Sequence, residues 1–133
     1  MPYWPTDVAQ KSAFIVVQGY YLVGSMTAWT GEEGLLLEPT DAFTFAGLVT
    51  LRHGWERFQV WVDGDPDRVL YPGSLEEVLG PESSVERWRS WRLEGEPGAR
   101  YEIRLQVNGK YMQLTYRQVS LTPLTLGALP LSS

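Results

Sequence analysis

The chain has a single imidazole, at His53, which limits the acid–base chemistry that the sequence can perform. A serine nucleophile needs a neighbouring base, and no Gly-x-Ser-x-Gly motif and no cysteine occur. The stretch "HGWE", residues 53–56, has turn composition, where a histidine is typically solvated. Glu32 and Glu33 are adjacent on another predicted turn, so they do not form a facing acid–base pair. We therefore predict no catalytic residue and no enzyme activity.

Three aspartates raise the possibility of a metal site. Asp63, Asp65 and Asp67 match the first, third and fifth positions of a calcium-binding loop. The sixth position should be Gly and is Arg68, while the twelfth should be Glu and is Ser74. We interpret "DGDPD" as an acidic turn and predict no metal and no cofactor. Phosphate-binding glycine motifs do not occur either.

The segment "ERWRSWR", Glu86–Arg92, interleaves three arginines with Trp88 and Trp91. Surfaces of this kind bind single-stranded nucleic acid, and they also suit sugars and proteins. A net charge of −5 argues against a nucleic-acid partner. Tryptophans packed inward beside Arg–Glu pairs would be the ordinary alternative. We favour a structural or protein-contact role for this segment.

The composition describes one folded domain that offers unusual amounts of aromatic surface. The 133 residues are 44% hydrophobic and 20% charged, and they include six Trp and seven Tyr. Aromatic residues are enriched at protein interfaces because they bury large areas at small entropic cost. The first twelve residues lack the pattern of a secretory signal, and no apolar run is long enough to cross a bilayer, so we expect a soluble protein made in a cytoplasm. Arg-rich, Pro-stiffened charged loops have a thermophilic character.

Short β-strands are the elements that must position these residues. We expect an extended N-terminal arm over residues 1–13 and one β-rich domain over 14–121, made of a part at 14–64 and an elaboration at 65–121. Strands are predicted around Phe14 and Val16, at 20–23 and 35–39, and as a hairpin within "AFTFAGLVTLRHGWERFQVWVDG" (42–64). A capping box and a terminal Gly predict a short helix over 74–80, and 85–93 is assigned as strand.

Asn108-Gly109 predicts a second hairpin, because this pair favours a type I′ turn. A two-residue loop there would pair Leu105 with Met112 and Ile103 with Leu114. Both pairs lie on the apolar face of the two flanking strands, so turn chemistry and hydrophobic pattern predict the same register.

The segment "LTPLTLGALPLSS" carries no charge, and its two prolines argue against a helix. Burial of one Leu stabilises by about 1.5–3 kcal/mol. We therefore expect the apolar C-terminal arm, residues 122–133, to lie against a partner or its own domain. Its candidate interface residues are Leu124, Leu126, Leu129 and Leu131.

From Gly19 to Gly64 the motifs follow the order "GYYLV", "AWTGEEG", "LLLEP", "FTFAGLV" and "FQVWVDG". This order resembles the body of the capsid decoration (cement or head-stabilising) proteins of tailed bacteriophages, the lambda-type β-tulip family. The resemblance covers about a third of the chain and rests on strand order and turn spacing. Residues 65–133 lie outside it.

The resemblance implies a small barrel or β-tulip. Together with the added hairpin sheet, the one short helix and the two arms that the residues themselves indicate, we predict a mainly β fold. The resemblance also implies a homotrimer on the outer surface of a virion, where it would bind the major capsid protein and clamp neighbouring capsid subunits. The candidate interface residues outside the tail are Tyr3, Trp4, Trp88 and Trp91. Two alternatives stay open: a small β-sandwich module that binds carbohydrate or single-stranded nucleic acid, and a phage-encoded regulator that docks on a host protein.

Overall fold

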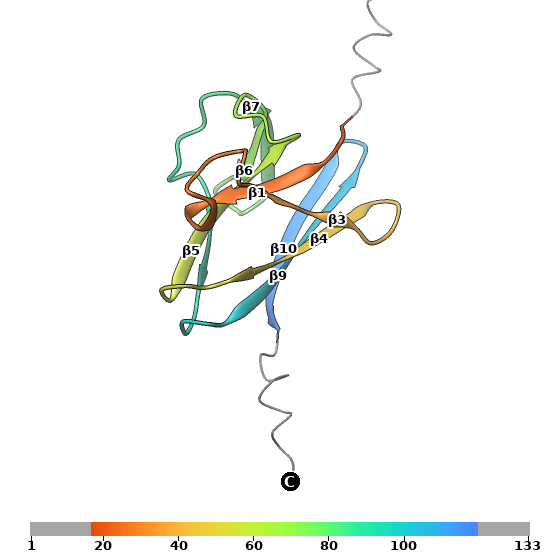
Figure 1. Ribbon diagram of the computed structural model, residues 1–133. Coiled ribbons are helices and arrows are strands. Elements are labelled where there is room, and N and C mark those ends of the chain that lie inside the picture. The colour runs from red at the N-terminus through yellow and green to blue at the C-terminus, as the bar shows by residue number, and fades with distance from the viewer. Residues whose placement is uncertain (1–16, 120–133) are drawn as a thin grey trace, which may run out of the picture.

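A computed structural model describes residues 17–119, which form ten strands in two antiparallel sheets (Figure 1). The expected mainly β fold is confirmed. Both predicted arms and the predicted strand around Phe14 and Val16 lie outside the described residues. Among the residues described, no helix has the length and apolar character needed to span a bilayer.

Sheet A is the larger sheet and is built around β5. Its strands are β1 (Tyr20–Gly24), β2 (Leu35–Leu36), β5 (Trp55–Val62), β6 (Val69–Pro72), β7 (Val78–Glu82) and β8 (Trp91–Glu94). One side of β5 pairs with β1. On the other side, its first half pairs with β8 and its second half with β6. A short 3-10 turn, η1 (Ser25–Thr27), follows β1.

Sheet B has the order β10-β9-β4-β3. Its strands are β3 (Glu38–Pro39), β4 (Thr44–Thr50), β9 (Arg100–Asn108) and β10 (Tyr111–Val119). Leu37 lies between β2 and β3, is buried, and donates its backbone N–H to Tyr20 O at 2.9 Å. The predicted strand at 35–39 therefore divides at Leu37 and contributes to both sheets.

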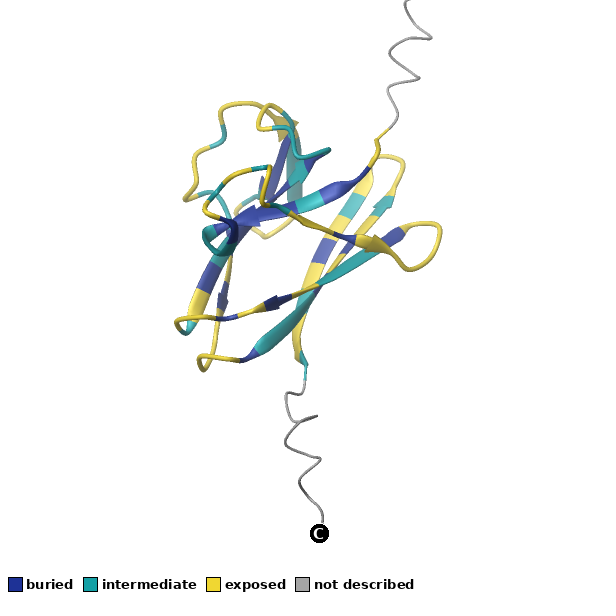
Figure 2. Cartoon of the chain, in the orientation of Figure 1, coloured by how far each residue is buried: buried dark blue, intermediate teal, exposed yellow. Residues whose placement is uncertain are grey.

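The core lies between the sheets and follows the predicted alternation of side chains (Figure 2). Phe58, Val60 and Val62 point inward from β5 and are buried, as the period-two pattern predicts. They meet Ile103 and Leu105 of β9 within one cluster. Because sheet B takes strands from both 14–64 and 65–121, the two parts of the chain share one core.

The predicted hairpin within 42–64 is wrong. β4 pairs with β3 and β9 in sheet B, whereas β5 pairs in sheet A. Residues 51–54 are therefore a crossover between sheets. Two adjacent alternating strands indicate a hairpin only when they pair with each other, and here each one finds a partner from elsewhere in the chain.

The β9–β10 hairpin exists, but its predicted register is wrong by two residues. Leu105 lies opposite Leu114 rather than Met112, and Asn108 pairs with Tyr111. The loop is therefore Gly109-Lys110, where only Gly109 has a positive φ, +65°, as in a type II′ turn. A two-residue shift keeps every side chain on its face, so the predicted apolar face is confirmed. The hairpin is also not an added sheet, because β9 pairs with β4.

The predicted helix at 74–80 is also wrong. Residues 73–77 form the tight connection between β6 and β7, with Gly73 N donating to Glu77 O at 2.8 Å. Glu77 does cap locally, because its Oε1 accepts from Leu75 N at 2.9 Å. The capping signal is real, but the chain turns back because Val78 pairs with Pro72.

The strand predicted at 85–93 is present only as β8 from Trp91 onward. Residues 83–90, hereafter the strap, connect β7 to β8 across the outward side of sheet A (Figure 1). The side chains of Arg57 and Gln59 in β5 bind the strap through hydrogen bonds.

Candidate protein-interaction surface

The outward side of sheet A carries Trp88 and the arginines of the motif at 86–92, together with two tryptophans from other parts of the chain. We define the Trp–Arg face by three tryptophans and three arginines: Trp29, Trp55, Trp88, Arg87, Arg89 and Arg92. Alternation along β5 explains why Trp55 lies on this side, since Phe58 and Val60 face the core. Trp88 is 69% exposed at the outside of the strap.

Each arginine of the face lies over an aromatic ring. The guanidinium carbon of Arg87 is 5.5 Å from the centre of the Trp29 ring, and that of Arg92 is 5.0 Å from the Trp55 ring. Arg89 lies over two rings. Cation–π contacts at exposed sites stabilise by about 0.5–1 kcal/mol each. They also hold long cationic side chains in defined positions.

Gln59 fixes the strap to sheet A. Its side chain is 1% exposed, and its Nε2 donates to Glu86 O at 2.9 Å and to Arg89 O at 3.0 Å. Its Oε1 accepts from Trp61 Nε1 at 3.0 Å. A buried amide with both ends hydrogen-bonded anchors the loop backbone, because breaking either contact would leave a polar group unpaired.

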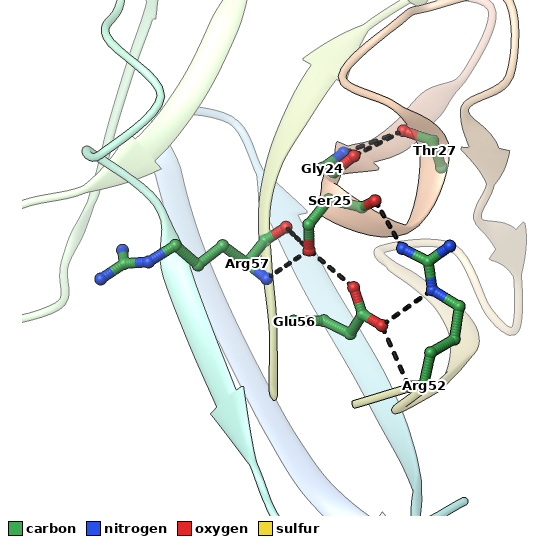
Figure 3. Close-up of polar contacts among 6 residues, drawn as sticks. All are labelled: Gly24, Ser25, Thr27, Arg52, Glu56 and Arg57. Atoms are coloured by element: carbon green, nitrogen blue, oxygen red, sulfur yellow. Dashed lines mark hydrogen bonds and ion pairs between the residues drawn. The ribbon is translucent and has the colours of Figure 1, made fainter. Parts of the chain in front are cut away.

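A polar cluster joins η1 and the crossover to the start of β5 (Figure 3). Glu56 is 1% exposed, accepts from Ser25 Oγ at 2.6 Å and pairs with Arg52 Nε at 3.1 Å. Ser25 Oγ in turn accepts from Arg57 N at 2.9 Å, and Arg57 reaches Ser90 Oγ of the strap at 3.1 Å. The base of the Trp–Arg face is therefore hydrogen-bonded as one unit.

Glu56 is charged in this cluster. Burial alone would raise the pKa of its carboxyl, but hydrogen bonds from Ser25 and Arg52, together with the Arg52 charge, hold the pKa below the ordinary value. The hydrogen bonds outweigh the effect of burial on this pKa, because both carboxylate oxygens have donors at 2.6–3.1 Å.

A groove of about 480 Å³ opens beside the strap. Trp88, Arg89 and Ser90 line one part of it, and the connection after β6 supplies the rest, including Ser74 and Glu77. An aromatic ring, a cation, a carboxylate and two hydroxyl side chains thus meet around one hollow. Volumes of this size fall in the range of ligand and side-chain pockets.

A second exposed apolar patch lies at the junction of the two sheets, between β2 of sheet A and β4 of sheet B. Leu36 and Leu48 are 51% and 47% exposed and, with Ala46, border a hollow of about 370 Å³. Glu38 and Glu102 stand at its edge. Exposed apolar patches with polar rims are typical of protein-contact sites.

Trp91 does not join the Trp–Arg face, and its assignment as an interface residue is corrected. Its ring is 2% exposed and stacks on Phe58 with ring centres 5.5 Å apart. Trp91 pairs opposite Phe58, which faces the core, so the ladder directs its ring inward. Trp88, three residues earlier, lies in the strap and stays outside. The candidates Tyr3, Trp4 and the tail leucines lie beyond the described residues.

The residues that the sequence analysis considered for catalysis or metal binding, His53 and the aspartates of 63–67, lie in different parts of the structure. His53 is exposed in the crossover between the sheets. Asp63 accepts from Gly19 N at 2.9 Å and pairs with Arg68 at 3.1 Å, while Asp65 accepts from Asp67 N. No cluster of three or more metal-ligating side chains is present within residues 17–119. Asp65 N donates to Val62 O and Arg68 N donates to Asp65 O, so this segment is a turn, as the sequence predicted.

Sequence reasoning missed Trp29 and Trp55 as parts of the face, and it missed the buried Tyr71 as a ring that positions Arg89. Trp55 could have been found, because it shares the alternation of Arg57 and Trp61 along one strand. Trp29 and Tyr71 have no such signal. They contact arginines of the face because the turn after β1 and strand β6 lie next to the strap.

Comparisons of the chain with protein-family models, with curated proteins and with solved structures find no match.

Proposed function

We propose that this protein is a structural, protein-binding component of a larger assembly. The observation that carries the proposal is the Trp–Arg face: exposed tryptophans and oriented arginines on a hydrogen-bonded base. Tryptophan, tyrosine and arginine dominate the energetic centres of protein interfaces. A rigid base favours binding because little entropy is lost when a partner docks.

The specific form of the proposal is decoration of a tailed-phage capsid. It rests on the resemblance of residues 19–64 and on a property that a clamp requires, namely two separate contact surfaces. The Trp–Arg face lies on the outward side of sheet A, whereas the patch around Leu36 and Leu48 lies where β2 of sheet A meets strands of sheet B. A trimer with such surfaces would bind neighbouring subunits of the major capsid protein at once, and multivalent attachment multiplies modest affinities.

Purified virions test this form of the proposal. Quantitative mass spectrometry of particles from a phage that encodes the chain should find it in copy numbers comparable to those of the major capsid protein. Replacement of Trp88 by Ala should lower its occupancy on those particles, whereas His53→Ala, at an exposed residue outside the face, should not. Particles that lack the wild-type chain would reject the capsid role.

A carbohydrate-binding or single-strand-binding module is the second candidate, and one observation favours it. The exposed Trp88 ring borders a groove that also offers hydroxyl and charged groups. Bases and sugar rings both stack on such platforms. Quenching of tryptophan fluorescence by an oligosaccharide or oligonucleotide, lost in Trp88→Ala, would support this candidate over the first.

A further inference from the structure

Arg89 differs from its neighbours in how its guanidinium is held. Its guanidinium carbon lies 4.7 Å from the centre of the Tyr71 ring and 5.6 Å from that of Trp88. Tyr71 is buried, and its hydroxyl donates to Glu82 at 2.7 Å, so one of the two rings has a fixed position. The backbone of Arg89 is also fixed, because Gln59 binds its carbonyl oxygen.

The hydrogen-bond donors of this guanidinium are free. Throughout the described part of the chain, no oxygen atom accepts from the Arg89 side chain. Arg57 donates to Ser90 and Arg92 pairs with Glu94, whereas Arg87 has no acceptor among the described residues either but lies over Trp29 and does not line the groove. The contacts with the Tyr71 and Trp88 rings do not use the N–H donors, which a guanidinium carries in its own plane. Arg89 also lines the 480 Å³ groove.

We propose that Arg89 is the anchor for a carboxylate on an acidic segment of the partner protein, with Trp88 packing against an adjacent apolar side chain of that segment. A guanidinium binds a carboxylate through two parallel hydrogen bonds, and positioning by aromatic rings lowers the entropy lost on binding. The inference rests on the proposed protein-binding function and names the chemistry of its partner.

The groove also argues for one carboxylate rather than a polyanion. Glu77 lines the same groove, and its Oε1 is occupied by Leu75 N. A nucleic-acid strand would bring several phosphates close to this carboxylate. A single Asp or Glu side chain brings one charge, which Arg89 compensates. The apolar ring of Trp88 then accommodates the neighbouring residue.

The test uses the ¹⁵N-labelled full-length chain and two synthetic peptides. One is an acetylated, amidated octapeptide of Asp, Glu, Leu and Phe, and the other carries Asn and Gln in place of the acids. The acidic peptide should shift the Nε–H resonance of Arg89 and the indole N–H resonance of Trp88. We expect its Kd to be at least about tenfold lower than that of the amide peptide.

Arginine variants provide the matched controls. Arg89→Lys and Arg89→Gln should each raise the Kd for the acidic peptide by about tenfold or more, because neither side chain offers two parallel donors. Arg87→Lys, whose side chain lies over Trp29 away from the groove, should change the Kd less than about twofold. Circular dichroism checks that the variants fold, and the two Arg89 variants are independent tests.

Several results would overturn the inference. The first two are equal affinity for the acidic and the amide peptide, and no binding of either peptide. The other two are a loss of affinity in Arg87→Lys as large as in the Arg89 variants, and shifts of the Arg89 and Trp88 resonances by inorganic phosphate as large as those caused by the acidic peptide at the same ionic strength. The virion experiment is independent of them. If the chain binds the peptide through Arg89 but is absent from virions, the carboxylate site is supported and the capsid role is rejected. If the chain is present in virions but does not bind the peptide through Arg89, only the carboxylate site is rejected.

Discussion

The buried Glu56 carboxylate shows how one residue joins three segments of the chain. It accepts hydrogen bonds from Ser25 in η1 and from the backbone and side chain of Arg52 in the crossover. A charged group this deeply buried is costly unless its oxygens are paired. Here the oxygens are paired, and the pairing lowers the carboxyl pKa.

Replacing Glu56 by Gln should destabilise the protein by about 1–3 kcal/mol at neutral pH, because an amide N–H₂ would face the donors of Ser25 or Arg52. In the wild-type protein the pKa of the Glu56 carboxyl lies below its ordinary value of 4.5. The ionised carboxylate therefore stabilises the fold above pH 4.5, and this contribution is lost as pH falls through the folded pKa. Urea unfolding of both proteins across this range measures the difference.

The difference in unfolding free energy between Glu56→Gln and wild type should therefore shrink on acidification. Glu94→Gln is the matched control, because Glu94 is 63% exposed and pairs with Arg92 at the surface. Such pairs contribute about 0–1 kcal/mol. A Glu56 effect that is as small as the Glu94 effect, or one that grows at low pH, would contradict the prediction.

Among the elements, the turn between β9 and β10 tests how the hairpin register is set. The ladder places Asn108 in β9 and leaves Gly109 as the one loop residue with positive φ. Open space surrounds the position where a Gly109 side chain would lie, so substitution there changes only the backbone energy.

Gly109→Ala should therefore cost about 1 kcal/mol or more, because an L-residue is strained at positive φ. Asn108→Thr should change stability by less than about 0.5 kcal/mol, since a β-branched residue suits a strand. Thermal or denaturant unfolding measures both. If Asn108→Thr is as destabilising as Gly109→Ala, Asn108 is a loop residue and the type I′ register is correct.

The strap is the second element whose conformation depends on a few contacts. Gln59→Leu keeps a similar volume but leaves the carbonyl groups of Glu86 and Arg89 without their donor. We expect a loss of about 1–3 kcal/mol in stability and faster tryptic cleavage after Arg87 and Arg89. The exposed Gln106→Leu is the control and should do neither. Unchanged proteolysis of Gln59→Leu would show that other contacts hold the strap.

At the scale of the whole molecule, the chain combines two sheets, two hollows with exposed apolar side chains, and a net charge of −5. The three arginines of the Trp–Arg face are cationic groups on an acidic protein, and one of them, Arg92, is paired with Glu94. Charge distributions of this kind orient partners during encounter. A partner with acidic groups opposite the face would dock in one orientation.

Deletion of residues 122–133 should weaken self-association or attachment to a capsid, because the leucines of that segment need an apolar partner. Size-exclusion chromatography with light scattering compares the truncated and full-length chains. A full-length variant with Ser at Leu124, Leu126, Leu129 and Leu131 separates loss of apolar surface from loss of length. Truncated and wild-type proteins of equal mass in solution, with equal capsid attachment, would refute the role of the tail.

Local pattern was sufficient for properties that depend on neighbours in the chain. Alternation in 58–62 and 101–107 predicted which side chains face the core, and the spacing at 63–74 indicated an acidic turn. These outcomes follow from the two-residue period of a strand and from short-range turn chemistry, both of which are encoded locally. Trp88 is exposed, and its role as an interface residue stays a prediction.

Tertiary structure alone decided the pairing of strands and the fate of ambiguous segments. β4 and β5 are adjacent in sequence but belong to different sheets, because β9 and β1 provide their partners. The capping signal at 74–77 became a turn once Val78 found Pro72, and Trp91 turned inward once it lay opposite Phe58. The sequence determined which faces are apolar. Contacts between residues distant in sequence decided which faces meet, because their energies depend on partners that no local pattern specifies.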